Sequence, residues 1–119
     1  MSRYVDGFVL PLPKKNLAAY RRLAQKASKM WREHGALEYR ECVGEDLAPT
    51  FGVPFPATVK VKKGETVVFS WVLFRSRAHR DKVNAKLMKD PRMAEMMSAG
   101  MPFDVNRMVC GGFDVLVEA

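Results

Sequence analysis

The stretch Glu65-Thr-Val-Val-Phe-Ser-Trp-Val-Leu-Phe-Arg75 decides the fold of this chain. β-Branched and aromatic residues dominate it, and the turn pair Lys63-Gly64 precedes it, which predicts a β-strand. Its two faces are both apolar, with Val67, Phe69, Trp71 and Leu73 on one and Val68, Val72 and Phe74 on the other. A strand with one wet face alternates apolar and polar residues instead. We therefore expect both faces of the surrounding sheet to be covered.

A second strand with two apolar faces is expected at residues 3–12, where aromatic and β-branched residues run into Pro11 and Pro13. Asn16 is the expected N-cap of the helix that follows, and Gly35 lies just past its end. The apolar stripe of this helix consists of Leu17, Tyr20, Ala24, Ala27 and Trp31. Because these residues share one helical face, the helix is expected to pack on the sheet.

The remaining elements complete an alternating order. We expect strands at residues 37–45 and 107–118 and helices at residues 76–89 and 91–98. Ser76 and Asp90 are favourable N-cap residues, and Pro91 suits the first position of a helix. Gly111-Gly112 predicts a bulge inside the last strand.

Two segments have unusual compositions. Residues 46–58 contain three prolines and predict an ordered but irregular loop, with Phe51 and Phe55 packed against the body of the protein. Loops of this length are often functional. Six of the eight methionines lie between residues 88 and 108, where they either fill the core under a short helix or form an adaptable binding surface. We favour core filling.

The order of elements is β-α-β-β-α-β, and 119 residues support a single domain, residues 1–119. This order predicts a ferredoxin-like α+β fold, an antiparallel sheet with its helices on one face. The first and third strands form the central pair of that sheet. Since the helices cover only one face, the other needs a layer that the chain does not supply. We expect a homodimer in which two sheets pack face to face.

Three segments carry a resemblance to a known family: Tyr4-Val5-Asp6-Gly7-Phe8-Val9; Val67-Val68-Phe69-Ser70-Trp71 with Ser76-Arg77-Ala78-His79-Arg80-Asp81-Lys82-Val83-Asn84; and Arg107-Met108 with Gly111-Gly112-Phe113. Together they resemble the bacterial YbaA-like family of the dimeric α/β-barrel superfamily, over essentially the whole chain. The resemblance implies the ferredoxin-like fold and a dimer that forms an α/β barrel. It implies no activity. The superfamily is similar in fold to cofactor-free monooxygenases of polyketide quinones, haem-degrading monooxygenases, chlorite dismutases, muconolactone isomerases and small ligand-binding regulators, which is analogy of fold alone.

The formal net charge of +7 is concentrated in the first third of the chain, where eight Lys and Arg face only two acids. Within residues 14–32 the bases lie opposite the apolar stripe, so the predicted helix has a basic outer face. Arg22, Lys26 and Lys29 are the candidate contacts if this face binds the phosphates of a nucleic acid. No aromatic residues interleave with the bases to stack on nucleobases, so we favour a solvated face.

The chain has neither a signal-peptide pattern at its N-terminus nor an apolar run long enough to span a membrane. We expect a cytoplasmic protein with no membrane partner. His34, Cys42, His79 and Cys110 do not have the paired spacing of a structural zinc site, so we predict no metal and no cofactor. Ser70 lacks the glycine-flanked elbow of a serine hydrolase, which argues against a catalytic triad.

Asp6 is the most unusual residue, because it lies in an apolar central strand and a buried carboxylate must be paired, hydrogen-bonded or protonated. Tyr4 shares its strand face, and Arg40 or Arg107 could neutralise the acid. Tyr39 and Trp71 could add aromatic walls with polar tips. Asp6 is then either a structural pair that holds the strand register or the dimer, which we favour, or the polar anchor or general base of a small pocket.

Two classes of function remain open. The first is a small-molecule binding protein or a cofactor-independent enzyme, monooxygenase-like by analogy of fold alone, with Asp6, Tyr4, Tyr39, Trp71 and Arg107 as candidate ligand contacts. The second is a nucleic-acid-associated or protein-interaction module acting through the basic helix at residues 14–32. We favour the first. The residues do not decide whether the pocket is catalytic, and no catalytic residue is assigned.

Overall fold

The structure, a computed structural model, describes residues 2–119. Its core is one antiparallel sheet in the order β2-β3-β1-β4. The strands are β1 (Tyr4–Pro13), β2 (Glu38–Val43), β3 (Glu65–Phe74) and β4 (Val109–Asp114). Strands β1 and β3 form the central pair, in register from Tyr4 opposite Phe74 to Pro13 opposite Glu65. The predicted ferredoxin-like order is confirmed.

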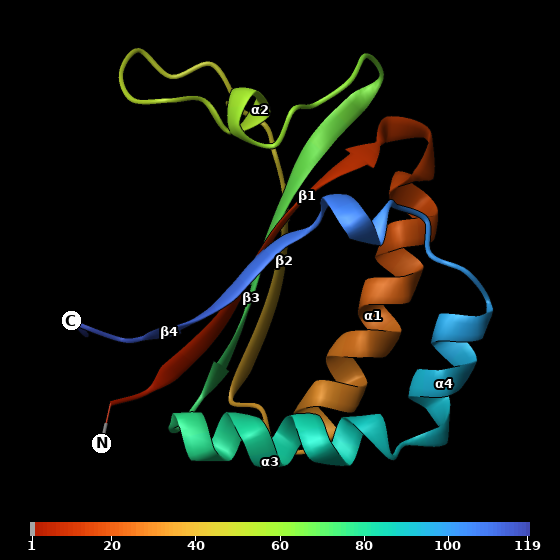
Figure 1. Cartoon of the computed structure of the whole chain (residues 1–119), viewed down its shortest axis with the longest axis vertical. Coiled ribbons are helices and arrows are strands. Elements are labelled where there is room, and N and C mark those ends of the chain that lie inside the picture. Colours follow the sequence, from red (N-terminus) through yellow and green to blue (C-terminus); the bar gives the residue numbers. More distant parts are fainter. Residues whose placement is uncertain (1) are drawn as a thin grey trace.

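The main helices are α1 (Leu17–Glu33), α3 (Arg77–Met88) and α4 (Pro91–Ser98). The short helix α2 (Phe55–Thr58) lies in the long loop, and the 3-10 turns are η1 (Lys14–Asn16) and η2 (Val105–Arg107). Figure 1 shows the sheet nearly edge-on, with α1, α3 and α4 on one side and only the loop that carries α2 on the other. The prediction that the helices cover one face is therefore confirmed. None of the helices described in residues 2–119 is long and apolar enough to cross a membrane.

The helix ends follow from local chemistry. The side chain of Ser76 accepts a hydrogen bond from the backbone N–H of His79 at 3.1 Å, and that of Asp90 accepts one from Arg92 at 3.0 Å. Both predicted caps are confirmed. Asn16 occupies the N-cap position of α1 without capping it, because its amide donates to the carbonyl of Pro102 at 2.8 Å.

The core lies between the sheet and the helices. Alternate positions of β1 and β3 face α1 and α3, which follows from the two-residue repeat of a strand. The buried side chains at these positions are Tyr4, Leu10, Leu12, Val68, Val72 and Phe74, joined by Tyr20, Ala24 and Met30 of α1 and by Val83 and Leu87 of α3.

The opposite side of the sheet is also apolar. We call it the open face, and it comprises Val5, Val9, Phe69, Trp71, Val109 and Phe113 around a shallow hollow. Within one chain it is largely uncovered, since Phe69 is 43% and Phe113 61% exposed. The predicted apolar character of both faces of the sheet is confirmed.

Three details of the prediction are wrong. Strand β4 ends at Asp114, and its register with β1 runs without a bulge from Val109 to that residue. Gly112 is small for a different reason: a Cβ there would overlap the ring of Tyr4. In the long loop, Phe51 projects into solvent at 86% exposure, whereas Phe55 packs against Phe69 with 6.3 Å between ring centroids.

Candidate functional site

A cavity of about 350 Å³ lies between the sheet, α1 and α4. Such a volume is at the lower end of the range of small-molecule sites. Its walls are almost entirely apolar and include Phe8, Leu10, Leu23, Ala24, Ala27, Trp31 and Phe103, together with the methionines Met93, Met96, Met97, Met101 and Met108. It is therefore suited to an apolar molecule.

The sequence explains why space remains here. The residues of α1 that face the sheet include Ala24 and Ala27, whose short side chains leave more space next to the sheet than longer side chains would. Across the cavity, α4 presents Met93, Met96 and Met97, which are unbranched and adapt readily to the shape of a partner. Met93, Met96 and Met108 pack against the core, as predicted, and five of the six methionines between residues 88 and 108 also line the cavity.

One end of the cavity is polar. The carboxylate of Glu41 on β2 accepts a hydrogen bond from the hydroxyl of Tyr20 on α1 at 2.7 Å and from that of Tyr39 on β2 at 2.6 Å. Ser70 lies opposite Glu41 in the β2–β3 register, is 5% exposed and lines the same cavity. We call Tyr20, Glu41 and Tyr39 the Tyr-Glu-Tyr cluster.

The electrostatics of this cluster determine what it can bind. Burial, followed by the charge of Glu41 and its hydrogen bonds, raises the pKa of Tyr20 and of Tyr39 well above the ordinary value of 10.0. Both hydroxyls stay protonated, and both protons are donated to Glu41. The cluster consequently offers only lone pairs to the cavity, so it suits a ligand that donates a hydrogen bond.

The cluster is also reached from outside. A groove of about 260 Å³ between α1 and β2 shares Tyr20, Ala24, Tyr39 and Glu41 with the cavity. The carboxylate of Glu41 therefore lies in a thin wall between the groove and the cavity.

Asp6 has a different partner from those that the sequence predicted. Arg80 on α3 donates a hydrogen bond to its carboxylate at 2.7 Å, and the two side chains are 18% and 11% exposed. Arg107 instead binds Glu65 at 2.7 and 2.9 Å, so pairing of Asp6 with Arg107 is wrong. Arg40 lies beside Glu38 at 3.7 Å, so pairing with Arg40 is wrong as well. The observed pair supports the structural interpretation of Asp6.

The predicted aromatic walls do not come together either. Tyr39 faces the cavity, whereas Trp71 lies opposite Gly7 on the open face, on the other side of the sheet. Tyr4 packs below the guanidinium of Arg80, at 4.9 Å from its ring centroid, and does not line the cavity. Of the five candidate ligand contacts, the structure places only Tyr39 in this cavity.

Sequence reasoning missed Tyr20 and Glu41. A signal for each was present: Glu41 is two residues after Tyr39 and so shares its strand face, and Tyr20 lies on the apolar stripe of the first helix. The sequence therefore shows that a carboxylate of the strand and a hydroxyl of the helix lie on two surfaces that pack together. Their contact was not recognisable from the sequence, because it depends on how α1 is placed against β2.

The basic residues Arg22, Lys26 and Lys29 line a second groove, between α1 and α4, with a volume of about 820 Å³. All three are exposed. They therefore lie on a solvated helix face, as expected, and they also border the hollow between the two helices. Leu23, Met96 and Met101 line both this groove and the cavity.

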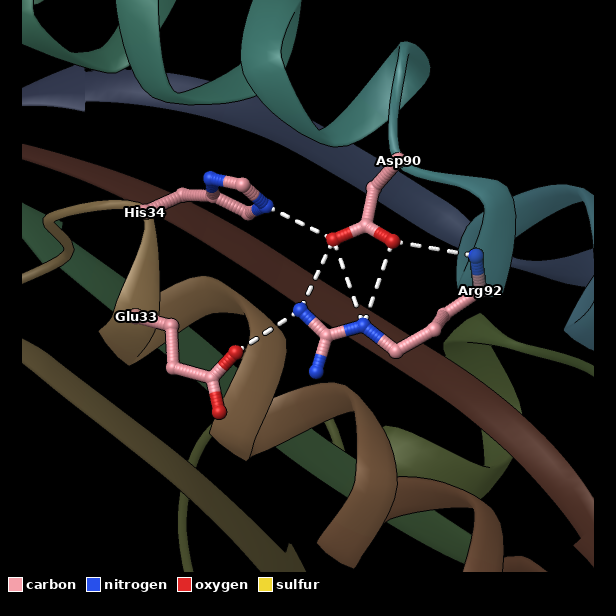
Figure 2. Close-up of polar contacts among 4 residues, drawn as sticks. All are labelled: Glu33, His34, Asp90 and Arg92. Carbon is pink, nitrogen blue, oxygen red and sulfur yellow. Dashed lines mark hydrogen bonds and ion pairs between the residues drawn. The ribbon is translucent and has the colours of Figure 1, made fainter.

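Helix α4 is fastened to the end of α1 by a polar cluster (Figure 2). Asp90 accepts hydrogen bonds from the His34 ring and from the Arg92 guanidinium, both at 2.8 Å. Arg92 also donates to Glu33 at 2.7 Å. Arg92 first, and then His34, lower the pKa of Asp90. Over residues 2–119 the structure contains no group of three or more His, Cys, Asp or Glu residues that could hold a metal ion.

Comparison with solved structures shows the same fold in proteins of low sequence identity. A dimeric ferredoxin-like protein from an uncultured marine organism matches with a TM-score of 0.57 and 12% identity, over all of both chains. Rv0793 from Mycobacterium tuberculosis matches with a TM-score of 0.58 and 18% identity, over 100% of this chain and 99% of that one. These likenesses concern the fold alone.

Comparison of sequences shows the family. Residues 3–105 match the family described as "Protein of unknown function (DUF1428)". The chain is 42% identical over 116 residues to the uncharacterized protein YbaA of Escherichia coli K12, and the match covers 98% of each. YbaA of Shigella flexneri matches with the same identity and coverage. The predicted resemblance is thus confirmed, and the chain belongs to the YbaA-like family, DUF1428.

Proposed function

We propose that this protein binds a small apolar molecule in the cavity between the sheet, α1 and α4. The observation that carries the proposal is the Tyr-Glu-Tyr cluster at one end of an otherwise apolar space of about 350 Å³. A few placed polar groups in an apolar pocket are typical of ligand sites. Because the cluster offers only acceptors, the ligand has a hydroxyl or N–H group at the end that meets Glu41.

The same geometry defines the chemical step that the site offers. Where the donor of the ligand is acidic, as in a phenol or an enol, Glu41 is the group that takes its proton. Tyr20 and Tyr39 hold the carboxylate in place and stabilise its charge through two hydrogen bonds. In an enzyme of this design, Glu41 is the general base of an apolar pocket.

The neutral fluorescent probe N-phenyl-2-naphthylamine tests binding, because it combines an apolar body with one N–H donor. The chain has two tryptophans, so Trp71→Phe leaves Trp31, in the cavity wall, as the only energy-transfer donor. In that background we expect saturable transfer from Trp31 to the probe. Ala27→Phe fills the cavity and abolishes binding, whereas Ala18→Phe, on the exposed side of the same helix, leaves it unchanged. Equal binding by both variants contradicts the proposal.

We also propose that two copies of the chain pair through the open face to form an α/β barrel. The support is the size and apolar character of this face, with Phe69, Val109 and Phe113 each more than 40% exposed. Monomeric proteins rarely leave such a continuous apolar patch in contact with water. The matching ferredoxin-like protein from the marine organism is described as dimeric.

A further inference from the structure

The groove between α1 and α4 adjoins the ligand cavity. Leu23 on α1, Met96 on α4 and Met101 line both spaces, so these side chains lie between them. Two of the three are methionines, which change rotamer easily. The groove is thus the place where a ligand longer than the cavity emerges toward solvent.

The rim of this groove is positively charged. Arg22, Lys26 and Lys29 project from α1, and within residues 2–119 none of them forms an ion pair with a carboxylate. Arg92 also lines the groove, but Asp90 and Glu33 neutralise it. The charge available to a ligand is therefore that of the three bases of α1.

Glu95 is the acid that lines the groove, on α4 across from the bases. One carboxylate does not balance three cations, so the field at the rim favours an anion. Binding of an anion here does not require the three bases to lose their hydration, because they are exposed and keep their contact with water.

We propose that the ligand is a small apolar acid, with its anionic group at Arg22, Lys26 and Lys29 and its apolar body in the cavity. This inference rests on the proposed function and names the class of its ligand. The donor group of the molecule meets the Tyr-Glu-Tyr cluster, and its carboxylate, sulfonate or phosphate remains at the rim. Tyr20 and Lys26 lie about 9 Å apart along the axis of α1, which sets the separation of the two polar ends. Nucleic-acid binding by the same bases does not explain why the groove that they line adjoins an apolar cavity.

The test compares two probes that differ only in charge. N-phenyl-2-naphthylamine is neutral, and 6-anilinonaphthalene-2-sulfonate is the same molecule with one sulfonate, which lies at the opposite end of the naphthalene from the N–H donor. With the full chain carrying Trp71→Phe, we expect the sulfonate to bind at least about five-fold more tightly, as one or two partly exposed charge pairs allow. Added salt reduces this preference, because it screens exposed charges, and leaves binding of the neutral probe unchanged.

The variant Arg22→Glu with Lys26→Glu tests the location of the charge. It abolishes the preference for the sulfonate and leaves binding of the neutral probe intact. Lys86→Glu, an exposed base on α3 away from the groove, is the matched control and keeps the preference. Binding of both probes with equal affinity, or a preference that survives in the double variant, overturns the inference alone. Absence of cavity-dependent binding by the neutral probe overturns the proposed function.

Discussion

Arg80 and Asp6 join α3 to the central strand β1, with a hydrogen bond of 2.7 Å between the guanidinium and the carboxylate. The guanidinium also lies over the ring of Tyr4, two residues earlier on the same strand face. Asp81 accepts a further hydrogen bond from Arg80 at 2.8 Å. Asp6 is thus part of the contact that holds α3 against the sheet.

Asp6→Asn tests this structural role. The change removes one of the two charge-assisted bonds of the partly buried Arg80 and leaves Asp81 as its remaining carboxylate partner, so we expect the free energy of unfolding to fall by about 1–3 kcal/mol. Chemical denaturation at neutral pH measures the loss. Binding of N-phenyl-2-naphthylamine should remain, because Asp6 does not line the cavity. A stable variant that no longer binds the probe would show that Asp6 belongs to the ligand site.

Phe113→Asp tests the homodimer. Sedimentation equilibrium of the wild-type chain is expected to give about twice the monomer mass of 13.5 kDa, because we propose that a second copy covers the open face. A charge at Phe113 on this face disrupts that contact and gives a monomer or an aggregate. Met88→Asp is the control, since Met88 is 77% exposed on α3, away from the open face. A wild-type monomer would refute the pairing.

Glu65 should make stability depend on pH in the acid range. The hydrogen bond from Arg107 chiefly, assisted by the backbone of Lys62, lowers the pKa of Glu65 from 4.5 to about 2. The unfolded chain therefore takes up this proton first, and the contribution of the pair is complete above pH 4.5 and is lost as the pH falls toward 2. Thermal unfolding of the wild type and of Glu65→Gln should show a difference at neutral pH that narrows in acid. A difference in stability between the two proteins that stays the same at every pH would show that the ion pair of Glu65 with Arg107 contributes nothing to stability.

Tyr20 and Tyr39 should make the protein less stable as the pH rises in the alkaline range, whereas Glu65 makes it less stable as the pH falls in the acid range. Burial and the charge of Glu41 raise both pKa values above 10.0, so the unfolded chain loses these protons first. The free energy of unfolding therefore falls as the pH rises above about 10. Ultraviolet difference spectra should show tyrosinate from these two residues only on unfolding. In Glu41→Gln they should ionise at a lower pH than in the wild type.

Asp90 combines two roles that two substitutions separate. Asp90→Ala removes both the N-cap of α4 and the contacts with His34 and Arg92, and a lost cap costs about 1 kcal/mol. Asp90→Asn keeps the capping oxygen and loses the charge. Hydrogen exchange of the α4 amides should be fastest in the Ala variant, intermediate in the Asn variant and slowest in the wild type. Equal exchange in all three would show that the cluster does not hold α4.

Much of the architecture was predictable because it rests on local patterns. Apolar residues on both faces of residues 65–75 indicated a central strand, and the caps at Ser76 and Asp90 marked the starts of two helices. Gly111-Gly112 misled the prediction, since glycine indicates either a bulge or a close approach. Only the ring of Tyr4 over Gly112 distinguishes the two.

The sequence by itself determined which residues form each element and which face each side chain occupies, because those properties repeat along one segment. It did not determine which side chain lies across from which. Glu41 meets Tyr20 from 21 residues away, and Asp6 meets Arg80 from 74 residues away. These contacts depend on the rotation and translation of a helix against the sheet. Only the tertiary structure sets those two quantities, so only it assembled the Tyr-Glu-Tyr cluster and separated Tyr39 from Trp71.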